Sequence, residues 1–137
     1  MAVCVLDASM AVSWFISAEA NAVAEAALDA VVQGGALAPA LWPLEVANTL
    51  VMAERRRRMT EAQRFLALAT LADLDITVEP QEVARVWSLV VDLAQAHQMT
   101  VYDATYLELA LRRSLPLATT DLALVRAAKA TGIGVLS

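Results

Sequence analysis

Short apolar runs alternate along the chain with longer stretches in which apolar residues recur every three or four positions. Such runs are typical of buried strands, and the recurring patterns are typical of helices that bury one face. We expect strands at 3–6, 36–38 and 76–78, in a segment ending near 119, and at 134–136. We expect helices after Ser9 and over 19–33, 43–57, 61–73, 80–97, 101–113 and 122–131. This alternation predicts an α/β fold with a parallel sheet covered on both faces.

Polar residues mark the beginnings of several of these helices. Ser9 can cap a helix that runs through Phe15, because a side-chain oxygen there can accept a hydrogen bond from the first turn. Thr60 and Gln63 have the spacing of a capping box. Thr100 is suited to cap the helix over 101–113.

That last helix carries an acid on its apolar face. Every third or fourth position of a helix lies on the same side. One stripe holds Asp103, Tyr106, Leu107 and Ala110, and the opposite stripe, expected to meet water, holds Thr105, Glu108 and Arg112. A carboxylate on a buried face needs a partner.

Three further acids occupy unusual positions. Glu45 forms a polar stripe with Asn48 and Thr49 inside the apolar segment LEVANTLVMA. Asp7 and Asp121 each follow an expected strand, where open α/β sheets place their ligand crevice. If the first and fourth strands are neighbours, as in a sheet ordered 3-2-1-4-5, these two aspartates meet.

Four carboxylates in one place predict a metal ion. They would repel one another and stay partly protonated unless cations neutralised them. Oxygen ligands without histidine or cysteine favour Mg²⁺ or Mn²⁺. Each acid also has an ordinary interpretation, because Asp121 can cap its helix, Asp7 can stabilise a turn, and Glu45 and Asp103 suit the first turn of a helix. The four together favour a site.

Composition narrows the class of protein. The length suits one domain, residues 1–137. Hydrophobic residues make up 59% of the chain, so we expect some apolar surface to contact another chain. No run reaches the roughly 18 apolar residues of a membrane span, and the N-terminus does not resemble a signal peptide, so we expect a cytoplasmic protein. A net charge of −5 argues against backbone-wide nucleic-acid binding, but not against binding through metal ions.

A few other residues have open interpretations. The basic run Arg55, Arg56, Arg57 and Arg58 is either a solvated helix end or a contact for RNA or a protein inhibitor. Cys4 lies in an apolar run and is expected to be a buried, unreactive thiol. Of the three tryptophans, Trp14, Trp42 and Trp87, we expect two in the core.

Four motifs in order resemble one family across nearly the whole chain. The segments VLDASMAVSWF, PLEVANTL, VYDATYLELA and ATTDLALVRAA are similar to the PIN-domain ribonucleases, in particular the VapC-type toxins of bacterial toxin–antitoxin pairs. The resemblance implies a three-layer α/β/α fold with a five-stranded parallel sheet ordered 3-2-1-4-5. It also implies a metal-dependent endoribonuclease that forms a homodimer, is inhibited by a cognate antitoxin, and meets DNA only through that antitoxin.

The family's acidic site maps onto four positions of this chain. They are Asp7, Glu45, Asp103 and Asp121, with Ser9, Asn48 and Thr120 as accompanying polar residues. The resemblance implies one or two Mg²⁺ or Mn²⁺ ions. Three of the acids would chiefly bind metal, and Glu45 would either complete the ligands or accept a proton from the attacking water. No further acid follows Asp121 in LALVR.

Two other classes of function fit part of the pattern. A phosphoryl-transfer protein could use Asp7 as a nucleophile, although Ser9 stands where a second acid is wanted and Lys129 lies inside a helix. A phosphoryl mimic trapped on Asp7 would favour this class. A non-catalytic binding module could keep the fold, and would be favoured by an absence of both Mn²⁺ binding and RNA cleavage.

Overall fold

The structure is a computed structural model and describes residues 1–16 and 21–136. The strands are β1 (Val5–Leu6), β2 (Ala36–Pro39), β3 (Ile76–Glu79) and β4 (Leu117–Ala118). The α-helices are α1 (Ala8–Ser13), α2 (Ala22–Gly34), α3 (Trp42–Arg55), α4 (Glu61–Asp73), α5 (Val83–Arg85), α6 (Val91–His97), α7 (Val101–Arg113) and α8 (Leu122–Thr131). A π-helical segment, η2 (Val86–Val90), joins α5 to α6. No helix in the described ranges is long and apolar enough to cross a membrane.

The sheet is parallel and has the order β3-β2-β1-β4. Val5 pairs with Leu37 on one side and with Leu117 on the other, which confirms that the first and fourth strands are neighbours. The prediction of a fifth strand at 134–136 is wrong for the described residues. Val135 makes only an isolated bridge to Leu117. On that side only Leu117 pairs, because its N–H donates to the carbonyl of Gly134 and its carbonyl accepts from the N–H of Leu136, both at 2.9 Å, while the carbonyls of Pro116 and Ala118 accept from β1 and from Asp7 on the other side.

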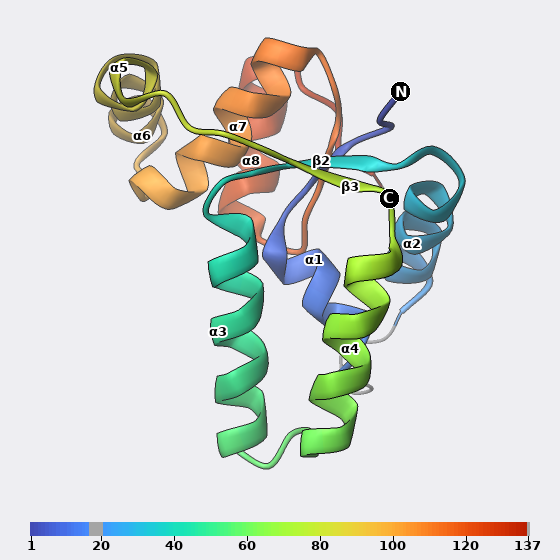
Figure 1. Ribbon diagram of the computed structural model, residues 1–137. Helices are drawn as coiled ribbons and strands as arrows, with labels where there is room; N and C mark the ends of the chain where they lie inside the picture. The colour runs from blue at the N-terminus through green and yellow to red at the C-terminus, as the bar shows by residue number, and fades with distance from the viewer. Residues whose placement is uncertain (17–20, 137) are drawn as a thin grey trace.

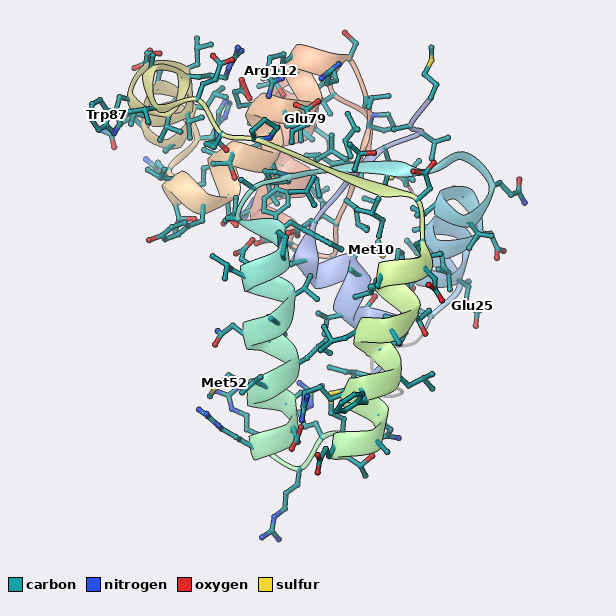
Figure 2. All side chains as sticks on the ribbon, viewed as in Figure 1. Met10, Glu25, Met52, Glu79, Trp87 and Arg112 are labelled. Carbon is teal, nitrogen blue, oxygen red and sulfur yellow. The ribbon has the colours of Figure 1, made fainter. Side chains whose placement is uncertain are left out.

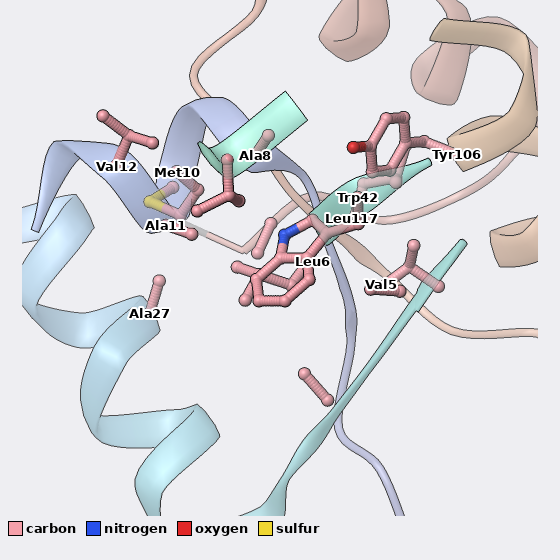
Figure 3. Packing of buried hydrophobic residues seen from close by; sticks show 14 of the residues in the cluster. Val5, Leu6, Ala8, Met10, Ala11, Val12, Ala27, Trp42, Tyr106 and Leu117 are labelled. Atoms are coloured by element: carbon pink, nitrogen blue, oxygen red, sulfur yellow. The ribbon is translucent and has the colours of Figure 1, made fainter. Parts of the chain in front are cut away.

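Helices cover both faces of the sheet, as predicted. In Figure 1, α1, α3 and α4 lie on one side and α7 and α8 on the other, with α5 and α6 packed at the edge of α7. The core between the layers contains β1, β4 and the apolar face of α7, with buried residues of β2 and of the helices on both sides. Figure 3 shows part of it, where Val5, Leu6, Trp42, Tyr106 and Leu117 pack together.

Two of the three tryptophans belong to the core, as expected. Trp42 is buried, and Trp14 is partly buried with its Nε1–H donating to the carbonyl of Ala24 at 2.9 Å. Trp87 is 77% exposed and extends away from the molecule in Figure 2. Cys4 is fully buried, which confirms the expected buried thiol, and this burial raises the pKa of the thiol to about 11.

Helix ends follow the capping signals with one exception. Thr60 and Gln63 form the reciprocal capping box, and Thr100 accepts a hydrogen bond from the backbone N–H of Asp103 at 3.1 Å. The prediction for Ser9 was wrong, because Asp7 is the N-cap and Ser9 lies inside α1. The hydroxyl of Ser9 donates to the carboxylate of Asp7 instead of capping the helix.

Several helix boundaries differ from the predicted ones. α1 ends at Ser13, before Phe15, and α3 covers Trp42–Arg55 rather than 43–57. The helix expected over 80–97 begins at Val83 and contains the π-helical turn η2. Residues 19–20 of the helix expected over 19–33 lie outside the described residues; Asn21 is the N-cap of α2, which ends at Gly34, one residue later than expected.

The stripe of α7 that was expected to meet water is instead largely buried. Thr105 and Glu108 are buried, while Arg112 is exposed as expected. The carboxylate of Glu108 accepts hydrogen bonds from Arg112 at 3.0 Å and from Arg85 at 3.3 Å. Arg112 also reaches Glu79 of β3 at 3.0 Å, and this pair is labelled in Figure 2. The prediction failed because α5 and α6 cover this face and supply a partner for the buried charge.

Replacing Glu108 with alanine should lower the free energy of unfolding by about 2 kcal/mol, because it leaves Arg85 and Arg112 facing each other without their shared anion. Urea denaturation would measure the change. Glu82→Ala is the matched control, because Glu82 pairs with Arg85 from an exposed position, and its loss should cost less than about 0.5 kcal/mol. Equal effects of the two substitutions would contradict this account of the buried network.

Candidate active site

An open cleft of about 460 Å³ lies at the carboxyl ends of the parallel strands. Asp7 directly follows β1, and Asp121 follows β4 after two threonines. Glu45 enters from the first turn of α3 and Asp103 from the first turn of α7. All four acids line this one cleft, and β1 and β4, which Asp7 and Asp121 follow, are neighbours in the sheet as assumed.

Two hydroxyl groups hold Asp7 at the floor of the cleft. Its Oδ2 accepts hydrogen bonds from Ser9 Oγ and from Thr119 Oγ1, both at 2.6 Å. Thr119 Oγ1 in turn accepts the backbone N–H of Asp121 at 3.0 Å. Thr119 therefore links the carboxylate after β1 to the backbone that carries the acid after β4.

Thr119 was not among the predicted site residues, whereas its neighbour Thr120 was. Both hydroxyls occur in the segment ATTD, and the one that turns inward follows from the alternation of side chains at the end of β4. Thr119 is buried, while Thr120 is exposed and lines the cleft, where its backbone N–H donates to Ser9 Oγ at 3.1 Å. The position of Thr119, two residues before Asp121, is the sequence feature that could have identified it as the hydroxyl that contacts the site.

The two acids on helices have different supports. The phenolic O–H of Tyr106 donates a hydrogen bond to Oε1 of Glu45. Asp103 is half-buried at the start of α7, where its backbone N–H donates to the side chain of Thr100. The side chain of Asp121 accepts the N–H of Ala123 at 2.8 Å and so caps α8. The ordinary interpretation of Asp121 is therefore also confirmed, and capping is compatible with a place in the cleft.

The acids perturb one another electrostatically. Burial raises the pKa of Asp7, and the charge of Asp121 raises it further, against the hydrogen bonds from Ser9 and Thr119 that lower it. Burial, followed by the charges of Asp121 and Asp7, raises the pKa of Asp103. Burial, with smaller contributions from Asp7 and Asp103, raises the pKa of Glu45 although Tyr106 lowers it. Ionising all of them together costs free energy, which a cation in the cleft would offset.

The chemistry of these donors fits a hard divalent cation. The cleft offers carboxylate oxygens without histidine or cysteine, and the mutual repulsion of its acids is the condition that Mg²⁺ or Mn²⁺ relieves. As the side chains are placed, however, no three acidic, histidine or cysteine residues within 1–16 and 21–136 are close enough to hold one ion. The acids share a cleft but are not a preassembled set of ligands, as expected when like charges repel.

Most of the remaining predicted positions line the same cleft, but Arg55 and Arg57 do not. Asn48 and Thr49 continue the stripe of Glu45 along α3, and Arg56 and Arg58 line the far part of the cleft. Arg55, Arg56, Arg57 and Arg58 are all exposed at the turn between α3 and α4. The cleft therefore has an acidic floor and basic residues at its α3–α4 end.

Comparison with known proteins identifies the family. A family model described as PIN domain matches residues 4–130. The chain belongs to the PIN-domain family. This PIN domain also resembles the crystal structure of PAE2754 from Pyrobaculum aerophilum, with a TM-score of 0.67 and 22% sequence identity over 93% of this chain and 87% of that chain. At this identity the likeness shows the fold. No curated protein matches this PIN domain. PIN domains are typically nucleases, which are hydrolases.

Proposed function

We propose that this PIN domain is a Mg²⁺- or Mn²⁺-dependent endoribonuclease and the VapC-type toxin of a type II toxin–antitoxin pair. The observation that supports nuclease chemistry is the gathering of Asp7, Glu45, Asp103 and Asp121 along one cleft from four separate segments. The proposed toxin role rests on the resemblance of the four motifs that carry these acids. The family match favours hydrolysis over phosphoryl transfer to Asp7.

Each acid has a role in the proposed reaction. Asp7, Asp103 and Asp121 would hold the metal, and Glu45 would complete the ligands or accept a proton from the attacking water. A bound divalent cation orients and acidifies that water and stabilises charge on the phosphate and the leaving oxygen. Ser9 and Thr119 keep Asp7 in place, because both of their hydroxyls donate to the same carboxylate oxygen.

Sequencing RNA ends after brief expression tests the proposed activity and finds its target. Cells expressing the wild-type chain should accumulate new RNA ends at defined positions. Cells expressing Asp7→Asn at the same level should not. Ends that appear equally with both proteins, or with neither, would contradict the proposed endoribonuclease.

We further propose a homodimer and a cognate antitoxin as partners. Large apolar side chains are exposed in two places that another chain can cover. They are Phe65 and Leu66 on α4, and Val83, Trp87 and Leu89 on α5 and η2. Exposed apolar area of this kind is typical of protein interfaces. Sedimentation velocity at micromolar concentration should show a dimer, and a monomer at every concentration would contradict it.

Reversing one basic residue of the cleft should weaken RNA binding. Arg56→Glu places a negative charge in the cleft lining, so we expect roughly tenfold weaker binding at low salt and a salt dependence reduced by about one ion. Arg57→Glu makes the same change at an exposed neighbour outside that lining and should have a smaller effect. Filter binding of a metal-free sample across salt concentrations would measure both. Unchanged binding by Arg56→Glu would remove the basic run from the RNA site.

A further inference from the structure

Tyr106 carries a hydroxyl group at a core position that an aromatic ring without a hydroxyl could fill. It is the largest fully buried side chain of the described residues and packs among the apolar residues of the core. Phenylalanine has the same ring, and burying a phenol without a hydrogen bond costs free energy. The hydroxyl therefore needs a partner, and Figure 3 shows it on the side of the ring that faces Ala8 at the start of α1.

That partner is Glu45. The phenolic O–H donates to Glu45 Oε1, across the space between α7 and α3 and over 61 residues of sequence. Tyr106 itself lies beneath the cleft, whose described lining includes Glu45 and Asp103 but not the tyrosine. The phenol thus contacts one acid of the site from behind, in a position that substrate does not reach.

The contact opposes the repulsion that acts on Glu45. Asp7 and Asp103 both act electrostatically on this carboxylate, and α3 lies at the surface, so an unrestrained glutamate can turn outward into water. Fixing a side chain with three rotatable bonds costs conformational entropy, which a charge-assisted hydrogen bond offsets. Within the described residues, Oε2 of Glu45 has no hydrogen-bond partner, so the bond to Oε1 leaves one oxygen for a ligand.

We infer that Tyr106 is a positioning residue that holds the Glu45 carboxylate in the cleft and thereby sets the affinity of the site for a divalent cation. The inference rests on the proposed function, because it assigns Glu45 to the metal site. Of the two tyrosines on α7, the inference assigns this role only to Tyr106. Tyr102 of the same helix is 66% exposed and has no such role.

Tyr106→Phe tests the inference because it removes one oxygen atom and keeps the ring. Outer partners of metal ligands typically contribute 10–100-fold to affinity or activity, so we expect Mn²⁺, titrated calorimetrically without RNA, to bind about tenfold more weakly. With Mg²⁺ and RNA, kcat should fall by a similar factor and KM should change less than about twofold. Tyr102→Phe makes the same chemical change at an exposed position and should match the wild type in both measurements.

A double-mutant cycle separates positioning from a purely structural role. If Tyr106 acts through Glu45, adding Tyr106→Phe to Glu45→Ala should not weaken Mn²⁺ binding further. A wild-type Mn²⁺ affinity in Tyr106→Phe would overturn the inference, as would an equal loss in the Glu45→Ala background. A lower melting temperature without a change in Mn²⁺ affinity would also overturn it, since that is the signature of a hydroxyl that serves only the core.

A second measurement does not depend on how well Tyr106→Phe folds. In the wild type, the hydroxyl proton of Tyr106 should give a slowly exchanging NMR signal that Glu45→Ala removes; persistence of that signal in Glu45→Ala would overturn the contact. The outcomes also distinguish the two proposals. Wild-type protein that neither binds Mn²⁺ nor cleaves RNA would overturn the proposed function and this inference together. Wild-type protein that does both, with Tyr106→Phe unchanged, would overturn this inference alone.

Discussion

Asp103→Asn should reduce RNA cleavage at saturating Mg²⁺ by about 100-fold or more, while the protein remains folded. Asparagine keeps the size of the side chain and one oxygen but removes the charge that would hold a cation among Asp7, Glu45 and Asp121. Loss of one preorganised electrostatic group typically costs 10²–10³ in kcat. The hydrogen bond that Asp103 makes at the start of α7 uses its backbone N–H, so the helix cap survives the substitution. Single-turnover cleavage of a labelled RNA would measure the rate.

Asp92→Asn is the control for this experiment. Asp92 is an exposed acid on α6, outside the cleft lining, and its replacement makes the same change of net charge. Its cleavage rate should equal that of the wild type. Circular dichroism should show that both variants are folded. Cleavage at the wild-type rate by folded Asp103→Asn would remove this residue from the active site.

Asp7→Asn should have opposite effects on activity and on stability. Without metal, burial and the charge of Asp121 raise the pKa of Asp7 above that of the unfolded chain, despite hydrogen bonds from Ser9 and Thr119. A group with a raised pKa contributes stability below its unfolded pKa of about 3.9 and loses it as the pH rises through its folded pKa. At pH 7.5 the metal-free variant should therefore melt at a higher temperature than the wild type, by about 4 °C for each 1 kcal/mol of relieved penalty.

Thermal melts in EDTA between pH 3.5 and 8 would test this expectation. The advantage of Asp7→Asn should shrink as the pH falls toward 4, because protonation then relieves the same penalty in the wild type. Adding Mn²⁺ should raise the melting temperature of the wild type and leave the variant nearly unchanged. Asp29→Asn, an exposed acid on α2, is the control for a simple change of net charge. A metal-free Asp7→Asn protein that melts below the wild type at pH 7.5 would contradict the electrostatic account.

The parts of the structure that could be predicted depend on local patterns and on strand order. α4 agrees with the prediction residue for residue, because the Thr60 capping box defines its beginning and Leu74 leaves the helical conformation at its end. The placement of Asp7 and Asp121 was predictable because the carboxyl ends of adjacent parallel strands lie at one edge of the sheet, and Glu45 and Asp103 were predicted from acids on otherwise apolar helix faces. Once β1 and β4 are neighbours, Asp7 and Asp121 lie near each other.

The parts that failed depend on contacts between distant segments. Thr105 and Glu108 have the spacing of a solvent-facing stripe, yet both are buried, and the 83–97 segment that packs against α7 supplies Arg85 as a partner for Glu108. Ser9 is a residue type that commonly caps helices, yet its hydroxyl donates to Asp7. There it lies 3.4 Å from the hydroxyl of Thr119, which is distant in the sequence. β4 is only two residues long and Val135 makes a single bridge. Both features depend on backbone pairing, which the side-chain pattern of so short a segment does not predict.

The hydrogen bond from Thr119 to Asp7 has a consequence for how the protein is made. β1 comes before the other strands in the chain, yet in the sheet it lies between β2 and β4, so its second edge is paired only after β4 has been synthesised. A ribosome has to translate past Asp121 before the last acid of the cleft exists. A chain that ends before Asp121 lacks one of the four acids of the proposed nuclease, so we expect such a nascent or truncated chain not to cleave the RNA of the ribosome that produces it.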